Sequence, residues 1–165
     1  MTNEPRSILI VDDDENNVEM ILMALSRQDF ACNPMVAGDG AEALDYLHRR
    51  ERLQGDNGGP PVLVLLDLKM PRMDGFEFLR ELRASETLKM IPAVVFTSSS
   101  DERDRRKSSQ LGANAYVVKP VDFDEFLAAI HAIGAFWTSV NQPVGREEAD
   151  SDFDDRGRRG GCRVE

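Results

Sequence analysis

Residues 61–67 read PVLVLLD, an apolar run that ends in a single aspartate. An unbroken apolar run of this length is typical of a strand buried on both faces, as in a parallel sheet covered by helices. It therefore predicts a central strand, and Asp67 at its end raises the question of what an acidic group does there.

Further apolar segments lie on both sides of this run and alternate with stretches of helical length. The predicted strands are SILIVD (7–12), ACNPMVA (31–37), PVLVLLD (61–67), PAVVFTS (92–98) and AYVVK (115–119), and the predicted helices are 15–28, 40–52, 75–85, 101–111 and 122–139. This alternation predicts an α/β fold, with a doubly wound, five-stranded parallel sheet and five helices. The third and fourth strands should be central, and Pro34 marks the second as an edge.

The composition bounds the architecture and the partners. The chain has 165 residues and a formal net charge of −10. We predict one folded domain over 1–143 and a disordered tail over 144–165, which has little to bury. The acidity argues against binding to nucleic acid, which requires clustered basic residues. With no signal-peptide pattern and no apolar run near the roughly 20 residues of a membrane span, we expect a cytoplasmic protein that binds no membrane.

Chemically distinctive side chains end four of the predicted strands. Asp12 and Asp13 end the first, Asp67 the third, Thr97 the fourth and Lys119 the fifth. We expect them to meet beyond the carboxyl ends of the strands, where ligands bind in such sheets. Carboxylates alone would repel one another and raise at least one pKa, whereas a cation would offset the repulsion. Oxygen ligands without histidine or cysteine favour Mg²⁺, which completes its shell with water and phosphate oxygens.

These side chains suit phosphoryl transfer. Asp67 is the candidate nucleophile, because an aspartate can form a covalent acyl phosphate. Thr97 can donate a hydrogen bond to a phosphoryl oxygen, and Lys119 can neutralise another as a compact charge. The set predicts a phosphoryl-accepting site in which positioning and electrostatics supply most of the catalysis.

Four motifs in this order resemble the receiver domain of bacterial two-component response regulators. They are ILIVDDD (8–14), LLDLKMPRMDGFEFL (65–79), VVFTSS (94–99) and AYVVKP (115–120). The resemblance implies a flavodoxin-like receiver fold, with Asp67 as the phosphorylation site. It also implies that Asp13, Asp67 and the backbone carbonyl of Lys69 ligate Mg²⁺, with Asp12 helping through water.

The same resemblance assigns roles to the last two motifs. Thr97 and Tyr116 would form the switch pair, Lys119 would contact the phosphoryl group, and the Lys119–Pro120 bond would be cis. The segments GANAYVVKPVDFDEFLAAIHAIGAFW (112–137) and RLQGDNGGPP (52–61) further resemble stand-alone receivers that accompany bacterial phytochromes. The partner implied is therefore a sensor histidine kinase, of the phytochrome type within that subgroup.

The fourth and fifth predicted helices differ in apolar content. DERDRRKSSQL (101–111) has almost no apolar face, so its docking should be weak. The fifth helix is apolar nearly all round, which usually indicates burial on both sides. We therefore predict a homodimer through the fifth-helix region, with an interface at Ala129, Ala132, Phe136 and Trp137.

Simpler interpretations exist for several of these residues. Asp14 could cap the first helix, and Thr97 could belong to a turn rich in hydroxyl groups, since three serines follow it. Tyr116 could be ordinary strand packing. AGDGAEAL (37–44) nearly matches a dinucleotide-binding fingerprint, but it follows the second strand, whereas that fingerprint belongs after the first.

The sequence as a whole predicts a single-domain response regulator. It would take a phosphoryl group from a phosphohistidine onto Asp67, and it would catalyse only its own phosphorylation and dephosphorylation. Its output could be altered partner or dimer affinity, a relay step or a phosphate sink, and the sequence does not choose. One alternative is a phosphorylation-independent adaptor on the same fold. Another is a metal-dependent phosphatase, although such enzymes place an acid where Lys69 stands.

Overall fold

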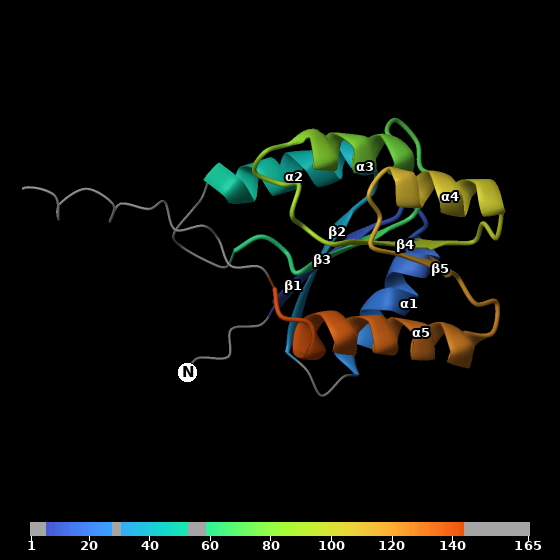
Figure 1. Ribbon diagram of the computed structural model, residues 1–165. Coiled ribbons are helices and arrows are strands. Elements are labelled where there is room, and N and C mark those ends of the chain that lie inside the picture. Colours follow the sequence, from blue (N-terminus) through green and yellow to red (C-terminus); the bar gives the residue numbers. More distant parts are fainter. Residues whose placement is uncertain (1–5, 28–30, 53–58, 144–165) are drawn as a thin grey trace, which may run out of the picture.

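The computed structural model describes residues 6–27, 31–52 and 59–143, which form alternating strands and helices (Figure 1). The strands are β1 (Arg6–Val11), β2 (Cys32–Ala37), β3 (Leu63–Leu66), β4 (Ala93–Thr97) and β5 (Ala115–Val118). The helices are α1 (Glu15–Ser26), α2 (Gly40–Arg52), α3 (Gly75–Ala84), α4 (Glu102–Gln110), α5 (Phe123–Ala135) and a π-helical turn, η1 (Phe136–Val140). Every strand and helix predicted from the sequence is present, with ends shifted by a few residues.

The strands form one parallel sheet in the order β2-β1-β3-β4-β5. This order, with its reversal between β1 and β3, is that of a flavodoxin-like fold, so the predicted fold class is confirmed. Strands β3 and β4 lie inside the sheet as predicted. Pro34 lies in the edge strand β2, where a missing backbone N–H is tolerated.

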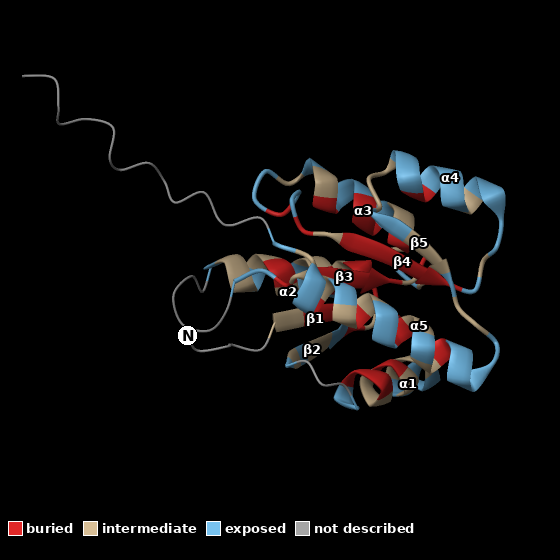
Figure 2. Ribbon diagram, turned by 60° about the horizontal axis from the view of Figure 1, so that its bottom comes forward, coloured by how far each residue is buried: buried red, intermediate tan, exposed pale blue. Residues whose placement is uncertain are grey.

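Helices cover both faces of the sheet. Helices α2, α3 and α4 lie on one face, and α1 and α5 lie on the other (Figures 1 and 2). Successive strand residues point to opposite faces. Val64 and Leu66 therefore pack in the core under α2 and α3, whereas Leu63 and Leu65 pack in the core under α1 and α5. All four residues of β3 are buried, which explains its unbroken apolar run.

Aspartates cap the starts of all five α-helices, and the one before α2, Asp39, is described below. Asp14, Asp74, Asp101 and Asp122 each accept hydrogen bonds from backbone amides of the first turn of α1, α3, α4 and α5. Each cap satisfies amides that have no partner inside the helix. Asp14 accepts from Asn16 N at 2.9 Å and Asn17 N at 3.3 Å, which confirms its capping role.

The end of the fifth helix differs from the sequence expectation of one continuous helix over 122–139. After Ala135 the chain forms the π-helical turn η1, in which Asn141 N donates to Phe136 O at 2.7 Å. Within this turn the buried Thr138 donates its hydroxyl to Gly134 O at 2.7 Å. Such bonds to the carbonyl four residues back commonly distort helices. Apolar periodicity does not report a change of this kind.

An ion pair fastens the β3–α3 loop to the start of α2. Asp39 is 2% exposed and accepts from Glu42 N at 2.9 Å and from Arg72 Nε at 2.6 Å. Arg72 has φ 62°, a left-handed conformation that is uncommon for residues other than glycine. Next to this pair, Gly40 N donates to Met73 O at 3.1 Å, and a Cβ on Gly40 would meet the Met73 side chain. These contacts fix the loop that leaves Asp67.

The pKa of Asp39 gives a stability prediction. Burial alone would raise this pKa, but hydrogen bonds from the Glu42 amide and from Arg72 lower it below its ordinary value of 3.8. A carboxyl with a lowered folded-state pKa stabilises the fold above its unfolded pKa, and this stability is lost as pH falls through the folded pKa. We expect Asp39→Asn to lower the free energy of unfolding at neutral pH, because it removes the ionic contact with Arg72. The loss should be only about 1 kcal/mol, since the Arg72 side chain is largely exposed to water.

Urea unfolding at pH 7 and in steps below pH 4 measures this effect. The asparagine keeps the capping oxygen, so the variant isolates the ionic contact. The stability curve of Asp39→Asn should be flatter than that of the wild type at acid pH. Asp45→Asn, on the exposed face of the same helix, is the control. Parallel curves for wild type and Asp39→Asn would contradict the assignment.

Candidate functional site

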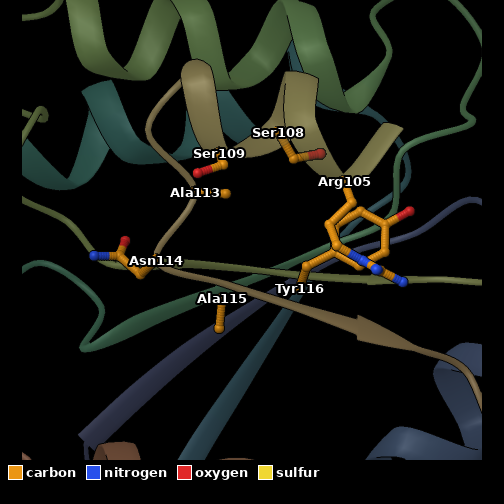
Figure 3. A pocket seen from close by; sticks show the side chains of 7 residues that line it. All are labelled: Arg105, Ser108, Ser109, Ala113, Asn114, Ala115 and Tyr116. Atoms are coloured by element: carbon orange, nitrogen blue, oxygen red, sulfur yellow. The ribbon is translucent and has the colours of Figure 1, made fainter. Parts of the chain in front are cut away.

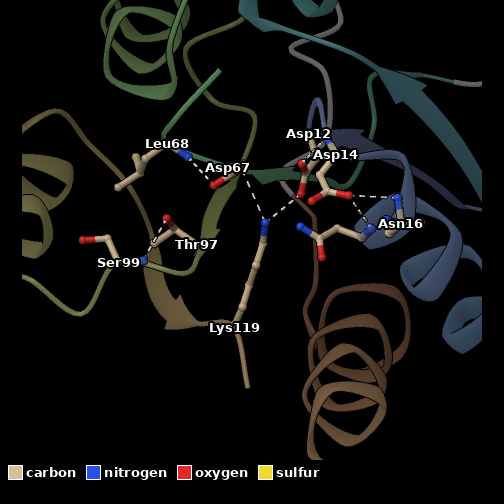
Figure 4. Close-up of polar contacts among 9 residues, drawn as sticks. Asp12, Asp14, Asn16, Asp67, Leu68, Thr97, Ser99 and Lys119 are labelled. Atoms are coloured by element: carbon tan, nitrogen blue, oxygen red, sulfur yellow. Dashed lines mark hydrogen bonds and ion pairs between the residues drawn. The ribbon is translucent and has the colours of Figure 1, made fainter. Parts of the chain in front are cut away.

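The candidate site lies where four strands end at the carboxyl edge of the sheet (Figure 4). Backbone hydrogen bonds extend the ladders by one residue and fix these ends. Asp12 N donates to Ala37 O at 3.1 Å, and Asp67 N donates to Val11 O at 2.9 Å. Each of these aspartates is therefore held by the strand beside it, and not by a flexible loop.

Three carboxylates meet at this edge. Ligand oxygens of Asp12, Asp13 and Asp67 all lie within 4.8 Å of one another, with Asp12 buried, Asp67 half-buried and Asp13 exposed. Charges about 4 Å apart repel by about 1 kcal/mol in bulk water and about 4 kcal/mol near a protein surface. Carboxylate oxygens alone are the donor set that hard divalent cations such as Mg²⁺ or Mn²⁺ take. The cluster fits such an ion.

Lys119 places one positive charge among the carboxylates. Its side chain is only 7% exposed, and Nζ donates to Asp12 Oδ2 at 2.8 Å and lies 3.4 Å from Asp67 Oδ2. Lys119 N donates to Thr97 O at 2.7 Å, which sets where the side chain leaves the strand. Three carboxylates and one ammonium leave two formal negative charges, which a divalent cation would neutralise.

The Asp67 carboxyl is held in a defined orientation. Leu68 N donates to Asp67 Oδ1 at 2.8 Å, while Oδ2 faces Lys119. Burial raises the pKa of the Asp67 carboxyl, and the nearby charge of Asp12 raises it further. The ammonium of Lys119 and the Leu68 amide lower this pKa, but the net effect places it above its ordinary value of 3.8. A cation beside the carboxyl would favour the ionised form. A cation bound at this cluster would thus hold the Asp67 carboxyl in its ionised form.

The two oxygens of Asp12 are both engaged by the protein. Oδ2 accepts from Lys119, and Oδ1 accepts from Asp14 N at 2.9 Å. Asp67 Oδ2 has only the longer contact of 3.4 Å to Lys119, and Asp13 is exposed, so these two carboxylates are more open to an ion than Asp12 is. This division agrees with the indirect role that the resemblance implies for Asp12.

The two residues expected to form a switch pair meet through a third one. Thr97 is 1% exposed, and its Oγ1 accepts from Ser99 N at 3.3 Å. Tyr116 donates its hydroxyl to Ser99 O at 2.8 Å. The Arg105 guanidinium carbon lies 5.7 Å from the centre of the Tyr116 ring, and both residues line a pocket of about 200 Å³ between α4 and β5 (Figure 3).

Sequence reasoning missed Ser99, because it treated the three serines after Thr97 as one hydroxyl-rich turn. In the structure Ser98 and Ser100 are exposed, whereas Ser99 is half-buried and joins Thr97 to Tyr116. No signal in the sequence separates the three.

The resemblance led to expectations about the Lys119–Pro120 bond and about the Lys69 carbonyl. The described residues contain no cis peptide bond, so Lys119–Pro120 is trans and the expected cis bond is wrong. The trans isomer is the ordinary preference even before proline. Lys69, two residues after Asp67, has an exposed side chain in the β3–α3 loop. The role of its carbonyl as a metal ligand stays a prediction.

The residues predicted for an α5 interface do not share one face. Ala132 and Phe136 are exposed, with Phe136 46% exposed. Ala129 and Trp137 are half-buried and pack against the core between α1, α5 and the sheet. Only the first two are free to meet a partner, because the helix turns the other two inward.

These features define a class of protein: a flavodoxin-like domain with an acidic cluster and a buried lysine at its carboxyl edge. The family model of the response regulator receiver domain matches residues 8–131. The chain therefore belongs to the response regulator receiver family, a family of phosphoacceptor signalling modules. Within the described ranges, no helix is long and apolar enough to cross a membrane.

Two curated proteins illustrate the similarity. The probable methanogenesis regulatory protein FilR2 of Methanothrix harundinacea is 34% identical over 142 residues, which are 86% of this chain and 90% of that protein. The response regulator Rcp1 of Synechocystis sp. is 31% identical over 136 residues, which are 82% of this chain and 91% of that protein.

Solved structures give the same picture. The phosphorylated cyanobacterial phytochrome response regulator RcpA is 33% identical, with a TM-score of 0.74 over 84% of this chain and 97% of that one. The Mn²⁺-bound form of Rcp1 is 29% identical, with a TM-score of 0.75 over 86% and 100%. The bacteriophytochrome response regulator AtBRR is 45% identical, with a TM-score of 0.64 over 84% and 99%.

The position of Lys119 predicts how the site responds to a cation. Lys119→Met leaves the buried Asp12 without its counter-charge, so the metal-free protein should lose about 3–5 kcal/mol of stability. The same change makes the cluster more negative, so divalent cations should stabilise the variant more than the wild type. Thermal unfolding in EDTA and in excess MgCl₂ measures both effects.

Lys89→Met serves as the control, because Lys89 pairs with Glu86 on the surface at 2.8 Å. It should behave like the wild type in both buffers. An equal rise in melting temperature with MgCl₂ in Lys119→Met and wild type would contradict the role of Lys119 as the internal counter-ion.

Proposed function

We propose that this protein is a response regulator that accepts a phosphoryl group on Asp67 from a phosphohistidine of a sensor histidine kinase, in a Mg²⁺-dependent reaction. The observation that carries the proposal is the placement of Lys119 Nζ between Asp12 and Asp67, beside a cluster of carboxylate oxygens within 4.8 Å. A nucleophile, a charge-neutralising ammonium and an ion site thus share one edge.

The transfer requires little covalent chemistry from the protein. One carboxylate oxygen of Asp67 attacks phosphorus, the P–N bond of the phosphohistidine breaks, and its electron pair stays on the imidazole nitrogen, which then takes a proton from water. Lys119 can move its ammonium from the carboxylates to a phosphoryl oxygen, and Thr97 can donate its hydroxyl to another. Mg²⁺, held by Asp13, Asp67 and the Lys69 carbonyl, would neutralise charge in the transferring group.

Signalling would follow from binding rather than turnover. The site chemistry consumes one phosphoryl group per Asp67, which suits a switch. A vestigial site, as in a phosphorylation-independent adaptor, would have lost one of the residues at the strand ends, and here each is in place. A phosphatase would need a second acid where Lys69 stands. These points favour the phosphoacceptor over both alternatives.

The proposed partner is a phytochrome-type sensor kinase. RcpA and AtBRR support this choice, because they are a phytochrome and a bacteriophytochrome response regulator and both match over nearly their whole length. We further propose that residues 1–143 form the receiver and that the protein acts in the cytoplasm without nucleic acid or membrane. The tail over 144–165 lies outside the described residues.

The phosphoacceptor proposal is tested by chemical labelling. With Mg²⁺ and acetyl phosphate, the wild type should gain one phosphate that survives acid and is removed by hydroxylamine, as an acyl phosphate is. Asp67→Asn should abolish it, because the amide is not a nucleophile of that kind. Phosphate content by intact-mass spectrometry is the readout.

Asp14→Asn provides a matched control. It removes one carboxylate from the same segment but keeps the oxygen that caps α1. Labelling of this variant should equal that of the wild type. Full labelling of Asp67→Asn would place the phosphate elsewhere and end the assignment.

We also propose a homodimer through the exposed side of α5. Ala132 and Phe136 lie four residues apart, and Val140 at 64% exposure continues the same row. Large apolar side chains gathered on one exposed face are typical of an interaction surface.

Phe136→Ser should weaken this dimer, because it removes the largest exposed apolar group of the row. Sedimentation velocity over a concentration series, with and without phosphorylation, measures the association. Met90→Ser changes a side chain that is 63% exposed outside α5 and should leave association unchanged. A wild type that stays monomeric at the highest concentration in both states would contradict the dimer.

A further inference from the structure

Ser99 occupies a junction in the loop between β4 and α4. Its N–H donates to Thr97 Oγ1 at 3.3 Å, its carbonyl accepts from the Tyr116 hydroxyl at 2.8 Å, and its own hydroxyl donates to Asp104 Oδ2 at 2.6 Å. The same Oγ accepts from Asp101 N at 3.3 Å. One residue therefore contacts the end of β4, the strand β5 and the first turn of α4.

The strengths of these contacts differ. A hydroxyl-to-carboxylate hydrogen bond of 2.6 Å is in the short, charge-assisted range, which is about twice as strong as a neutral bond. The 3.3 Å contact to Thr97 lies beyond the usual range of about 2.7–3.2 Å for N–H donors. The Ser99–Asp104 link should thus persist when the weaker contact between Ser99 and Thr97 breaks.

Helix α4 depends on polar contacts of this kind. The buried residue of α4 is Ser108, and the helix carries no large apolar side chain into the core. Lys107 Nζ lies 4.2 Å from the centre of the Phe76 ring, which is a cation–π contact to α3. Polar, partly exposed attachments give a segment low local stability, so α4 can shift at small cost.

The far end of α4 is anchored differently. Arg83 on α3 donates to Gly112 O from Nε at 3.0 Å and from a terminal nitrogen at 2.8 Å. It also donates to Ile91 O at 2.7 Å, so the turn after α4 is tied to the loop before β4. Because Arg83 anchors the far end of α4, the helix can pivot about that end, so that its first turn moves when the loop at Ser99 moves.

We propose that Ser99 is the positioning residue that couples Thr97 to α4, with its hydroxyl acting on Asp104 and its carbonyl acting on Tyr116. This rests on the proposed function, because a phosphoryl group on Asp67 is what would draw the Thr97 hydroxyl away from Ser99 N. The released loop then carries Asp104 and the first turn of α4 with it. Tyr116 and Arg105 line the α4–β5 pocket, so its shape changes in the same step.

Amide hydrogen exchange of the full chain, resolved by NMR, tests the link without phosphate. Arg105 N donates to Asp101 O at 3.1 Å near the start of α4, and Leu111 N donates to Lys107 O at 3.0 Å at its end. Ser99→Ala should speed exchange at Arg105 about three- to tenfold and at Leu111 less than about twofold, since one hydrogen bond is lost at one end. Asp104→Asn, which weakens the bond from the other side, should act in the same direction.

The second arm measures coupling. On phosphorylation the wild type should change exchange at Arg105, whereas Ser99→Ala should show less than about half of that change with its phosphate content kept within about twofold. Ser99→Thr retains a hydroxyl and should restore the response. Ser100→Ala, a neighbouring exposed serine, should match the wild type.

The outcomes separate the two proposals. Equal exchange at Arg105 in Ser99→Ala and wild type, or an effect of Ser100→Ala as large as that of Ser99→Ala, overturns the Ser99 link. Suppose that faster exchange at Arg105 without phosphate is seen only in the Ser99 and Asp104 variants, while the wild type takes up no phosphate. This result supports the Ser99 link and overturns the proposed function. A normal α4 response in phosphorylated Ser99→Ala overturns the coupling while leaving the phosphoacceptor role intact.

Discussion

The contact of the Lys119 ammonium with Asp12 and Asp67 is the constraint around which the carboxyl edge of the sheet is built. Its nitrogen lies 2.8 Å from one carboxylate and 3.4 Å from the other. Without this ammonium, the buried Asp12 would face another carboxylate with no counter-charge. An unpaired charge in such a buried environment strongly destabilises the folded state. With the ammonium, the cluster keeps a surplus of negative charge that favours a cation. The strand ends β1, β3 and β5 must therefore stay in register, or this balance is lost.

The rest of the molecule divides into strongly and weakly held parts. Helices α1, α2, α3 and α5 each bury apolar residues against one face of the sheet, so their positions are set by packing. Helix α4 instead relies on Ser99, Lys107 and the Arg83–Gly112 contact beyond its end. When polar contacts of this kind break, water replaces them with little net loss of free energy. The element best able to move is thus the one that joins the Thr97 end of β4 to the surface beside Tyr116.

Much of the fold could be predicted because its signals are local. Unbroken apolar runs mark β3 and β4, Pro34 marks the edge strand, and aspartates mark the helix starts. The residues at the strand ends could be predicted to meet because parallel strands bring their carboxyl ends to one edge. The π-helical turn after Ala135 could not be predicted, since it follows neither from apolar pattern nor from composition. The trans bond before Pro120 is the ordinary preference of the peptide bond, and only the resemblance pointed to the cis isomer.

The sequence by itself determined which chemical groups stand at the ends of the strands and that a cation would suit them. Only the tertiary structure decided that Ser99, rather than Ser98 or Ser100, joins Thr97 to Tyr116. It alone decided that Arg72 reaches Asp39, and that Trp137 turns inward while Phe136 faces out. The physical reason is that these contacts join residues on different elements, or choose between two apolar sides of one helix. Local pattern fixes the spacing of side chains, but the packing of α4 and α5 on the sheet fixes what each one meets.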